Sequence, residues 1–187
     1  MSKFTAVDLF SGMGGLSLGF QLDGRFDVVA GIDNYEPAVR TFYRNHPAAC
    51  EAYARSTNVQ YLTGKSLLST LGLSSIDVVL GGPPCQGFSA AGRRDDNDER
   101  NQLVWEYVRL VDELKPKFFL MENVPRITLA KDNGVLFVDK LLEQFRLLGY
   151  QARLFAINAK DFGVPQVRKR VFIVGNRMGK TPVSMAE

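Results

Sequence analysis

Short apolar runs alternate along the chain with longer stretches in which apolar residues recur every three or four positions. Runs of the first kind predict buried strands, and the second pattern predicts amphipathic helices. The predicted strands are Phe4–Leu9, Val28–Ile32, Val59–Leu62, Val78–Leu80, Phe118–Met121, Ala152–Ile157 and Val171–Val174. This alternation indicates an α/β fold with a mostly parallel sheet and helices on both faces.

Four helices are predicted in the segments between these strands. The first contains Leu16 and Phe20, and the second has Pro37 in its first turn, where proline is tolerated. The third ends before Pro116, and the fourth covers Leu136–Leu148. The last two strands are joined by a loop without a helical pattern, so we expect them to pair antiparallel near one end of the sheet.

The composition narrows the class of protein but not its function. Of 187 residues, 45% are hydrophobic and 23% are charged, which suits one globular domain with a substantial core. The net charge of +3 agrees with a polyanionic partner, and equally with many proteins that have none. The two cysteines, Cys50 and Cys85, lack metal-ligand spacing, so neither a disulfide framework nor a metal site is predicted.

The N-terminus and the length of the apolar runs indicate the compartment in which the protein is expected. The N-terminus shows no signal-peptide pattern, and no apolar run approaches the roughly 20 residues that a bilayer span requires. We therefore expect a cytoplasmic protein without a membrane partner.

A glycine-rich turn, Asp8–Gly15, separates the first strand from the first helix. Its glycines let a ligand approach the backbone, and a helix N-terminus favours polar or anionic groups. Asp33 ends the second strand about 20 residues further on, where an acid can hold ribose hydroxyls. Capping of the helix that follows is the alternative role for Asp33. Because the turn has no P-loop lysine and serine pair, a nucleoside without a long phosphate chain fits better than a triphosphate.

The segment Gly82-Pro83-Pro84-Cys85 forms a stiff turn after an apolar strand. Two prolines fix two φ angles and remove two amide donors, so the segment neither extends the strand nor continues as a helix interior. A stiff turn at a strand end is a suitable mount for a nucleophilic cysteine. Ligands bind outside the carboxyl ends of the strands in open parallel sheets, so we expect Phe10, Asp33 and Cys85 to converge there.

Two further segments carry candidate chemistry. Glu122 follows the apolar strand Phe118–Met121, and its carboxyl group is a candidate proton donor, a helix cap or an ion-pair partner of Arg168 or Arg170. These two arginines differ by two positions, so in extended backbone they share a face that can clamp an anion. A solvated basic run is the alternative explanation. The polar segment 87–101 is either a solvated loop or a lid over the cysteine.

Together these segments resemble the cytosine-5 DNA methyltransferase family. The resemblance extends from Phe4 to about Asn176, and the motifs stand in the family's order. They are Asp8–Gly15, Pro83-Pro84-Cys85-Gln86, Glu122-Asn123-Val124 and Gln166-x-Arg168-x-Arg170. The resemblance implies a Rossmann-like fold of the S-adenosylmethionine-dependent methyltransferases, with an antiparallel strand near one edge of the sheet.

The resemblance also implies a reaction and its catalytic residues. The thiolate of Cys85 would add to carbon 6 of a cytosine flipped out of double-stranded DNA. Glu122 would protonate or hydrogen-bond ring nitrogen 3 and the exocyclic amine, and carbon 5 would then take the methyl group of S-adenosyl-L-methionine, leaving S-adenosyl-L-homocysteine. Arg168 would hold the base or the backbone, and Arg170 would support Glu122.

The cofactor site follows from the same resemblance, and no metal is implied. Phe10 would pack on the adenine, Asp33 would hold the ribose, and the backbone around Gly12 would pass the methionine part. The residues expected at the cofactor are Phe10, Gly12, Gly14, Gly15, Asp33, Asn34 and Pro84. Asn34 departs from the family, which often has a bulky residue beside the ribose acid, and Lys65 stands where an acid is common.

The family normally continues with a target-recognition region and a final helix, which this sequence does not contain. We therefore expect residues 1–176 to form a catalytic and cofactor-binding domain and residues 177–187 a C-terminal tail. A second chain or a missing segment would supply the recognition region, as part of a split or truncated restriction–modification enzyme. A non-catalytic module that binds cofactor or DNA and an RNA cytosine-5 methyltransferase are the alternatives.

Overall fold

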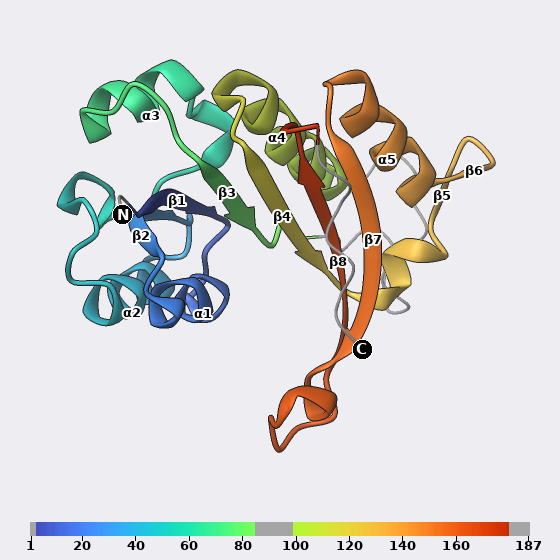
Figure 1. The fold of residues 1–187 in the computed structure, drawn as a ribbon, viewed down its shortest axis with the longest axis horizontal. Helices are drawn as coiled ribbons and strands as arrows, with labels where there is room; N and C mark the ends of the chain where they lie inside the picture. The colour runs from blue at the N-terminus through green and yellow to red at the C-terminus, as the bar shows by residue number, and fades with distance from the viewer. Residues whose placement is uncertain (1–2, 85–98, 180–187) are drawn as a thin grey trace.

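The computed structural model describes residues 3–84 and 99–179, and these form a six-stranded sheet flanked by helices (Figure 1). The strand order across the sheet is β2-β1-β3-β4-β8-β7. In chain order the strands are β1 (Phe4–Leu9), β2 (Phe26–Ile32), β3 (Val78–Gly81), β4 (Phe118–Asn123), β7 (Gln151–Asn158) and β8 (Lys169–Asn176).

Strand direction confirms the fold class expected from the sequence. Strands β2, β1, β3 and β4 are parallel to one another, whereas β8 runs antiparallel to both β4 and β7. Within the described part of the chain, β8 is thus the one strand of this sheet that runs against the others, next to edge strand β7. The expected antiparallel pairing of the last two strands is confirmed.

Helices cover both faces of the sheet because successive strand side chains point to opposite sides. Ala6, Val28 and Leu80 face α1 (Gly15–Asp23) and α2 (Glu36–Asn45), which contribute Phe20 and Phe42 to that layer. The other face packs against α3 (Gly64–Leu71), α4 (Glu99–Leu114) and α5 (Phe137–Leu147). Among the described residues, no helix is long and apolar enough to cross a membrane.

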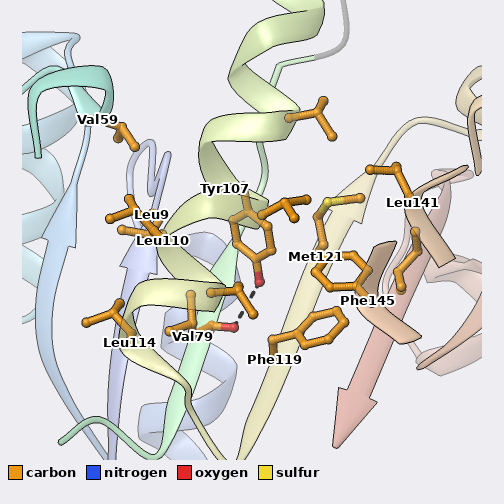
Figure 2. Packing of buried hydrophobic residues seen from close by; sticks show 14 of the residues in the cluster. Leu9, Val59, Val79, Tyr107, Leu110, Leu114, Phe119, Met121, Leu141 and Phe145 are labelled. Atoms are coloured by element: carbon orange, nitrogen blue, oxygen red, sulfur yellow. Dashed lines mark hydrogen bonds between the residues drawn. The ribbon is translucent and has the colours of Figure 1, made fainter. Parts of the chain in front are cut away.

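The larger core lies between the sheet and α4 and α5 (Figure 2). Tyr107 of α4 is fully buried, and its hydroxyl donates a hydrogen bond to the carbonyl oxygen of Val79 at 3.0 Å. Phe119 of β4 stacks on Phe145 of α5 with ring centroids 4.0 Å apart. These contacts fix β3 and β4, whose ends carry two of the candidate motifs, against helices that bury them from solvent.

The prediction of a strand at Val59–Leu62 is wrong. The segment forms a 3₁₀ turn, η2 (Val59–Tyr61), capped by the side chain of Asn58. The backbone carbonyls of Val59 and Leu62 accept hydrogen bonds from Arg109 of α4, at 3.3 and 2.9 Å, so a strand partner is not needed. Val59 and Leu62 are buried, but against a helix, whereas Tyr61 is 87% exposed.

Helix α3 was not predicted from the sequence. Thr63 and Ser66 form a capping box in which each side chain accepts a hydrogen bond from the other residue's amide. Glu113 of α4 also accepts a hydrogen bond from the amide of Gly64 at 2.6 Å. The shorter elements are η1 (Glu51–Tyr53), η3 (Pro125–Thr128), β5 (Lys131–Asp132), β6 (Val135–Leu136) and η4 (Ala159–Phe162).

The pairing of β4 with β8 generates a test of the packing. Phe119 lies directly over Gly175, and a Cβ added at Gly175 would meet its ring at 2.1 Å. We expect Gly175→Ala to lower the free energy of unfolding by about 1–3 kcal/mol, because the ring has to move within a packed core. Urea denaturation followed by circular dichroism measures the change.

Gly19→Ala is the matched control. Gly19 lies inside α1, and a Cβ added there meets nothing within 4 Å. Because alanine has the better helix propensity, we expect this variant to be unchanged or stabilised by up to about 1 kcal/mol. Equal stability of the two variants would contradict the packing of Phe119 over Gly175.

Candidate active site

The register of the sheet brings the candidate motifs to one edge. Ile32, Leu9, Gly81 and Met121 are successive partners across β2, β1, β3 and β4. The next residue on each strand is therefore Asp33, Phe10, Gly82 and Glu122, in that spatial order. These four parallel strands point the same way, so the glycine-rich turn, the Pro-Pro turn and the carboxyl group of Glu122 all lie at the carboxyl edge.

The glycine-rich turn begins with a strained residue. Phe10 is half-buried and has φ 56°, in the left-handed region that non-glycine residues rarely adopt. The amide of Ser11 donates to the carbonyl of Ile32 at 3.1 Å, and the amide of Gly14 donates to the carbonyl of Ser11 at 2.9 Å. Strain of this kind concentrates at functional sites, where the surrounding structure imposes it.

Asp33 joins the glycine-rich turn to the start of α2. One carboxylate oxygen accepts a hydrogen bond from the amide of Gly12 and the other accepts one from the amide of Tyr35, both at 2.9 Å. Tyr35, not Asp33, is the N-cap residue of α2, so the proposed capping role is replaced by a link between two loops. Each carboxylate oxygen keeps capacity for a further donor such as a ribose hydroxyl. The neighbouring side chain of Asn34 is exposed.

The glycine-rich turn is open on one side and filled on the other. A Cβ added at Gly12 or Gly15 meets nothing within 4 Å, whereas one added at Gly14 would meet His46 Nε2 at 2.7 Å and Phe42 at 2.8 Å. Gly12 and Gly14 also have positive φ values, 53° and 86°, which favour glycine. The open side gives a ligand direct access to the backbone and to the N-terminus of α1.

The buried imidazole of His46 packs against the filled side of the glycine-rich turn. Nothing in the sequence indicates this role. His46 is 1% exposed, stacks on Phe42, and pairs through Nδ1 with the side-chain oxygen of Gln21. Its Nε2 lies 3.4 Å from the hydroxyl of Ser17, which in turn donates to the carbonyl of Gly14 at 3.3 Å. Burial lowers the pKa of His46, so the imidazole is neutral at physiological pH.

The Pro-Pro turn is tied to both neighbouring strands. The amide of Gly82 donates to the carbonyl of Leu9 at 3.3 Å. The buried side chain of Asn123 donates to the carbonyl of Pro83 at 3.0 Å, and its oxygen accepts from the amide of Val124 at 2.9 Å. The sequence identifies Asn123 only as part of a motif, and its anchoring role depends on a contact that the sequence does not reveal. Pro84 is half-buried; Cys85 lies outside the described residues.

Glu122 lies within β4 and not after it, and it forms an ion pair with Arg170. The distance between Arg170 Nε and a carboxylate oxygen of Glu122 is 2.6 Å, and both side chains are about three-quarters buried. The other oxygen of Glu122 lies 3.4 Å from a Cβ built on Gly82, so the carboxyl group borders the Pro-Pro turn. Partly buried charge pairs are held more firmly than exposed ones, which fixes the orientation of this acid.

Arg168 and Arg170 are not equivalent. Arg170 belongs to β8, while Arg168 precedes the strand, has an exposed side chain, and donates its amide to Asn158 at 3.0 Å. Arg170 also borders a pocket of about 580 Å³ between η3 and the turn that joins β7 to β8. The pocket is lined by Pro125, Ala156, Ile157, Asn158, Lys160, Asp161, Phe162, Lys169 and Arg170.

Two expectations are limited by the described part of the chain. Most of the segment 87–101, considered above as a lid or a solvated loop, lies outside it, as does most of the tail 177–187. Within residues 3–84 and 99–179, no group of three or more histidine, cysteine, aspartate or glutamate side chains could hold a metal ion.

Comparison with known proteins identifies relatives over nearly the whole chain. The chain is 42% identical to the type II methyltransferase M.XorII of Xanthomonas oryzae over 183 residues, which are 96% of this chain and 42% of that protein. It is 38% identical to the type II methyltransferase M.AquIA of a Picosynechococcus strain, covering 94% of this chain and 73% of the relative. The chain thus spans less than half the length of the first of these relatives.

Solved structures agree in fold. A prophage-encoded E. coli protein, assigned to the DNA modification methyltransferases, superposes with a TM-score of 0.77 at 36% identity, over 93% of this chain and 47% of that one. The Dnmt2 methyltransferase of S. pombe superposes with a TM-score of 0.76 at 22% identity, over 98% and 54%, and supports the fold alone. The model of the C-5 cytosine-specific DNA methylase family matches residues 4–186, and the chain belongs to this family.

Proposed function

We propose that this chain transfers a methyl group from S-adenosyl-L-methionine to carbon 5 of cytosine in DNA through a covalent cysteine adduct. The observation that carries the proposal is the register of the sheet, which puts Phe10, Gly82 and Glu122 one residue past the same row of strand partners. A cofactor turn, the base of a nucleophile turn and a carboxylic acid therefore face a common space at the carboxyl edge.

The residues of the glycine-rich turn suit a nucleoside cofactor with an amino-acid tail. Asp33 would accept hydrogen bonds from the ribose hydroxyls, and Phe10 would pack on the adenine ring. The open backbone at Gly12 and Gly15 and the N-terminus of α1 would bind the carboxylate of the methionine part. Asn34 and Pro84 would border the cofactor, and the strained φ of Phe10 supports a ligand-binding turn. When bound, S-adenosyl-L-methionine supplies an electrophilic methyl group on sulfonium, with S-adenosyl-L-homocysteine as the product.

The chain's own residues would make carbon 5 of cytosine nucleophilic. The thiolate of Cys85 would form a bond to carbon 6 while Glu122 gives a proton to nitrogen 3, so that the ring electrons move to carbon 5. Carbon 5 would then be nucleophilic enough to take the methyl group, whose bond to the sulfonium sulfur would break as the new carbon–carbon bond forms. Transfer of the carbon 5 proton to solvent water and expulsion of the Cys85 thiolate would restore the aromatic ring, and the proton on nitrogen 3 would return to Glu122.

Arg170 and Arg168 would have different roles, one toward the acid and one toward the DNA. The ion pair with Arg170 holds Glu122 beside Gly82, where its proton has to be delivered, and so supports a fixed orientation for the acid. Arg168, exposed just before β8, would hold the base or the DNA backbone. The target cytosine has to leave the duplex to reach these groups.

The choice of target sequence is a separate question from the chemistry of methyl transfer. The chain corresponds to 42% of M.XorII, and reading of base edges in the major groove requires side chains that reach the groove. We propose that a further segment or a second chain provides this recognition and that methyl transfer by the 187 residues alone is weak.

Covalent trapping tests the nucleophile. Duplex DNA in which 5-fluorocytosine replaces every cytosine carries the analogue at any target that the protein can reach, and the fluorine blocks the last elimination. With S-adenosyl-L-methionine present, we expect a protein–DNA adduct that survives a denaturing gel, and at least tenfold less adduct with Cys85→Ala. Cys50→Ala is the matched control and retains the adduct, because Cys50 belongs to the segment before η1.

The same assay separates the alternatives. Adduct formation on 5-fluorocytosine RNA and not on DNA would favour an RNA methyltransferase. Absence of any adduct, with and without the target-recognition region of a relative added as a separate chain, would favour a non-catalytic module. An adduct of normal yield with Cys85→Ala would overturn the assignment of the nucleophile.

Asn123→Ala tests the anchoring of the Pro-Pro turn. The variant removes the donor to the Pro83 carbonyl in a buried site, and we expect it to lose about 1–3 kcal/mol of unfolding free energy and most of the adduct yield. Asn45→Ala, at the exposed end of α2, is the matched control and should change neither quantity. Normal adduct yield in a folded Asn123→Ala protein would show that this hydrogen bond does not position the nucleophile turn.

A further inference from the structure

The hairpin formed by β7 and β8 carries a pocket to which the proposed reaction assigns no ligand. This hairpin pocket, bordered by Arg170, lies between η3 and the turn that contains η4, and its volume of about 580 Å³ is in the range of small-ligand sites. Figure 1 shows the turn projecting beyond the sheet. The pocket is therefore next to the candidate active site but outside the space between Gly82 and Glu122.

The turn at the end of the hairpin has a fixed backbone and exposed apolar side chains. The amide of Ala159 donates to the carbonyl of Arg168 at 2.9 Å, and the amide of Arg168 donates to the side chain of Asn158 at 3.0 Å. Phe162 and Val167 in the same turn are nevertheless 61% and 74% exposed. Apolar side chains that gather on an exposed, ordered turn indicate a binding surface, and an aromatic ring there suits a planar ligand.

The charges around the pocket favour an anion. Three cations line it, Lys160, Lys169 and Arg170, against one acid, Asp161. Arg170 is paired with Glu122 at 2.6 Å, whereas neither lysine forms an ion pair with any described residue. Both lysine side chains are exposed, so their ammonium groups are available to a ligand.

The remaining lining is largely apolar. Pro125, Ala156, Ile157 and Phe162 contribute it, from η3, β7 and η4. A ligand that suits the whole pocket has a flat apolar part for this surface and an anionic part for the lysines. A nucleotide has both, because its base stacks on aromatic side chains and its phosphate binds to cations.

We propose that the hairpin pocket binds one nucleotide of the DNA strand that carries the target cytosine, with its base against Phe162 and its phosphate at Lys160 and Lys169. This inference rests on the proposed function, because it takes a flipped cytosine to lie beside Glu122. Arg170 connects the two sites, since it pairs with Glu122 and also borders the pocket. A nucleotide in the pocket is thus close to the target in the same strand.

Such a subsite would assist removal of the cytosine from the duplex. A flipped base loses its pairing and stacking, and its neighbour in the strand loses a stacking partner as well. Stacking of the neighbouring base on Phe162 replaces part of that loss. Because every base has a π face, this contact works with any neighbouring base and adds affinity without reading the sequence.

Photo-crosslinking tests where the base lies. A short single-stranded thymidine oligonucleotide with one 5-iodouracil needs no unpairing and contains no cytosine, so its binding does not depend on the proposed catalytic site. Irradiation joins 5-iodouracil mainly to aromatic side chains in contact with it. We expect peptide mapping of the 187-residue protein to identify Phe162 as the main crosslinked residue. Crosslinks confined to residues outside the pocket would overturn the inference.

The affinity for the thymidine oligonucleotide tests the stacking. By fluorescence anisotropy, Phe162→Ala should weaken binding about five- to fiftyfold, as expected for loss of one base–aromatic stack, and Phe162→Tyr should retain it. Tyr61→Ala is the matched control, because it removes an aromatic ring that is 87% exposed in η2. Equal affinity of Phe162→Ala and the wild type would overturn the stacking and favour a protein partner for the exposed ring.

The salt dependence of the same binding tests the phosphate contact. Lys160→Gln and Lys169→Gln should each reduce the slope of log affinity against log salt concentration by about 0.7, the value for one phosphate of a single strand. Lys131→Gln, at an exposed position of β5, should leave the slope unchanged. An unchanged slope in both pocket variants would overturn the phosphate assignment.

Two comparisons separate this inference from its alternatives. Thymidine 5′-monophosphate that binds as tightly as the oligonucleotide would overturn the assignment to a DNA strand in favour of a free nucleotide. Covalent trapping on 5-fluorocytosine DNA without a crosslink at Phe162 would overturn the hairpin pocket alone. A crosslink at Phe162 without any trapping would instead overturn the proposed reaction and leave the nucleotide site.

Discussion

The alignment of parallel strand ends is the constraint on which the rest of this structure depends. Because Ile32, Leu9, Gly81 and Met121 form one row of partners, four loops leave the sheet side by side. The row is held from one face by Tyr107 and Phe119 and from the other by α1 and α2. A slip of one residue in any of these strands would turn a functional side chain to the wrong face.

Hydrogen bonds between loops then convert this alignment into a site. Asp33 reaches from the end of β2 to Gly12, Asn123 reaches from β4 to the carbonyl of Pro83, and Arg170 reaches from β8 to Glu122. Each of these bonds joins segments that are distant in sequence, so the site exists only in the folded sheet. Antiparallel β8 is essential here, because its direction brings its first residues to the edge where β4 ends.

The features that destabilise the folded state lie in and beneath the glycine-rich turn. Phe10 holds a left-handed φ, Asp8 is buried, and within residues 3–84 and 99–179 the buried hydroxyl of Ser11 has no hydrogen-bond partner. His46, Ser17 and Phe42 fill the space below Gly14, so the turn is supported where it is strained. Strained backbone and unpaired polar groups destabilise the folded state, and they are typical of turns that bind a ligand. In a turn with only a structural role, such groups would be expected to find hydrogen-bond partners or to be replaced.

The sequence by itself determined the alternation of strands and helices and the residues of the four motifs, because hydrophobic periodicity and glycine or proline chemistry are local properties. It could not determine that Val59–Leu62 is a turn under Arg109, that Thr63 starts a helix, or that Glu122 pairs with Arg170 and not with Arg168. It also gave no sign that Asp8, His46 and Asn123 are buried at the site. Only the tertiary structure decided these points, because hydrogen-bond partners and desolvation depend on which distant segments the sheet brings together.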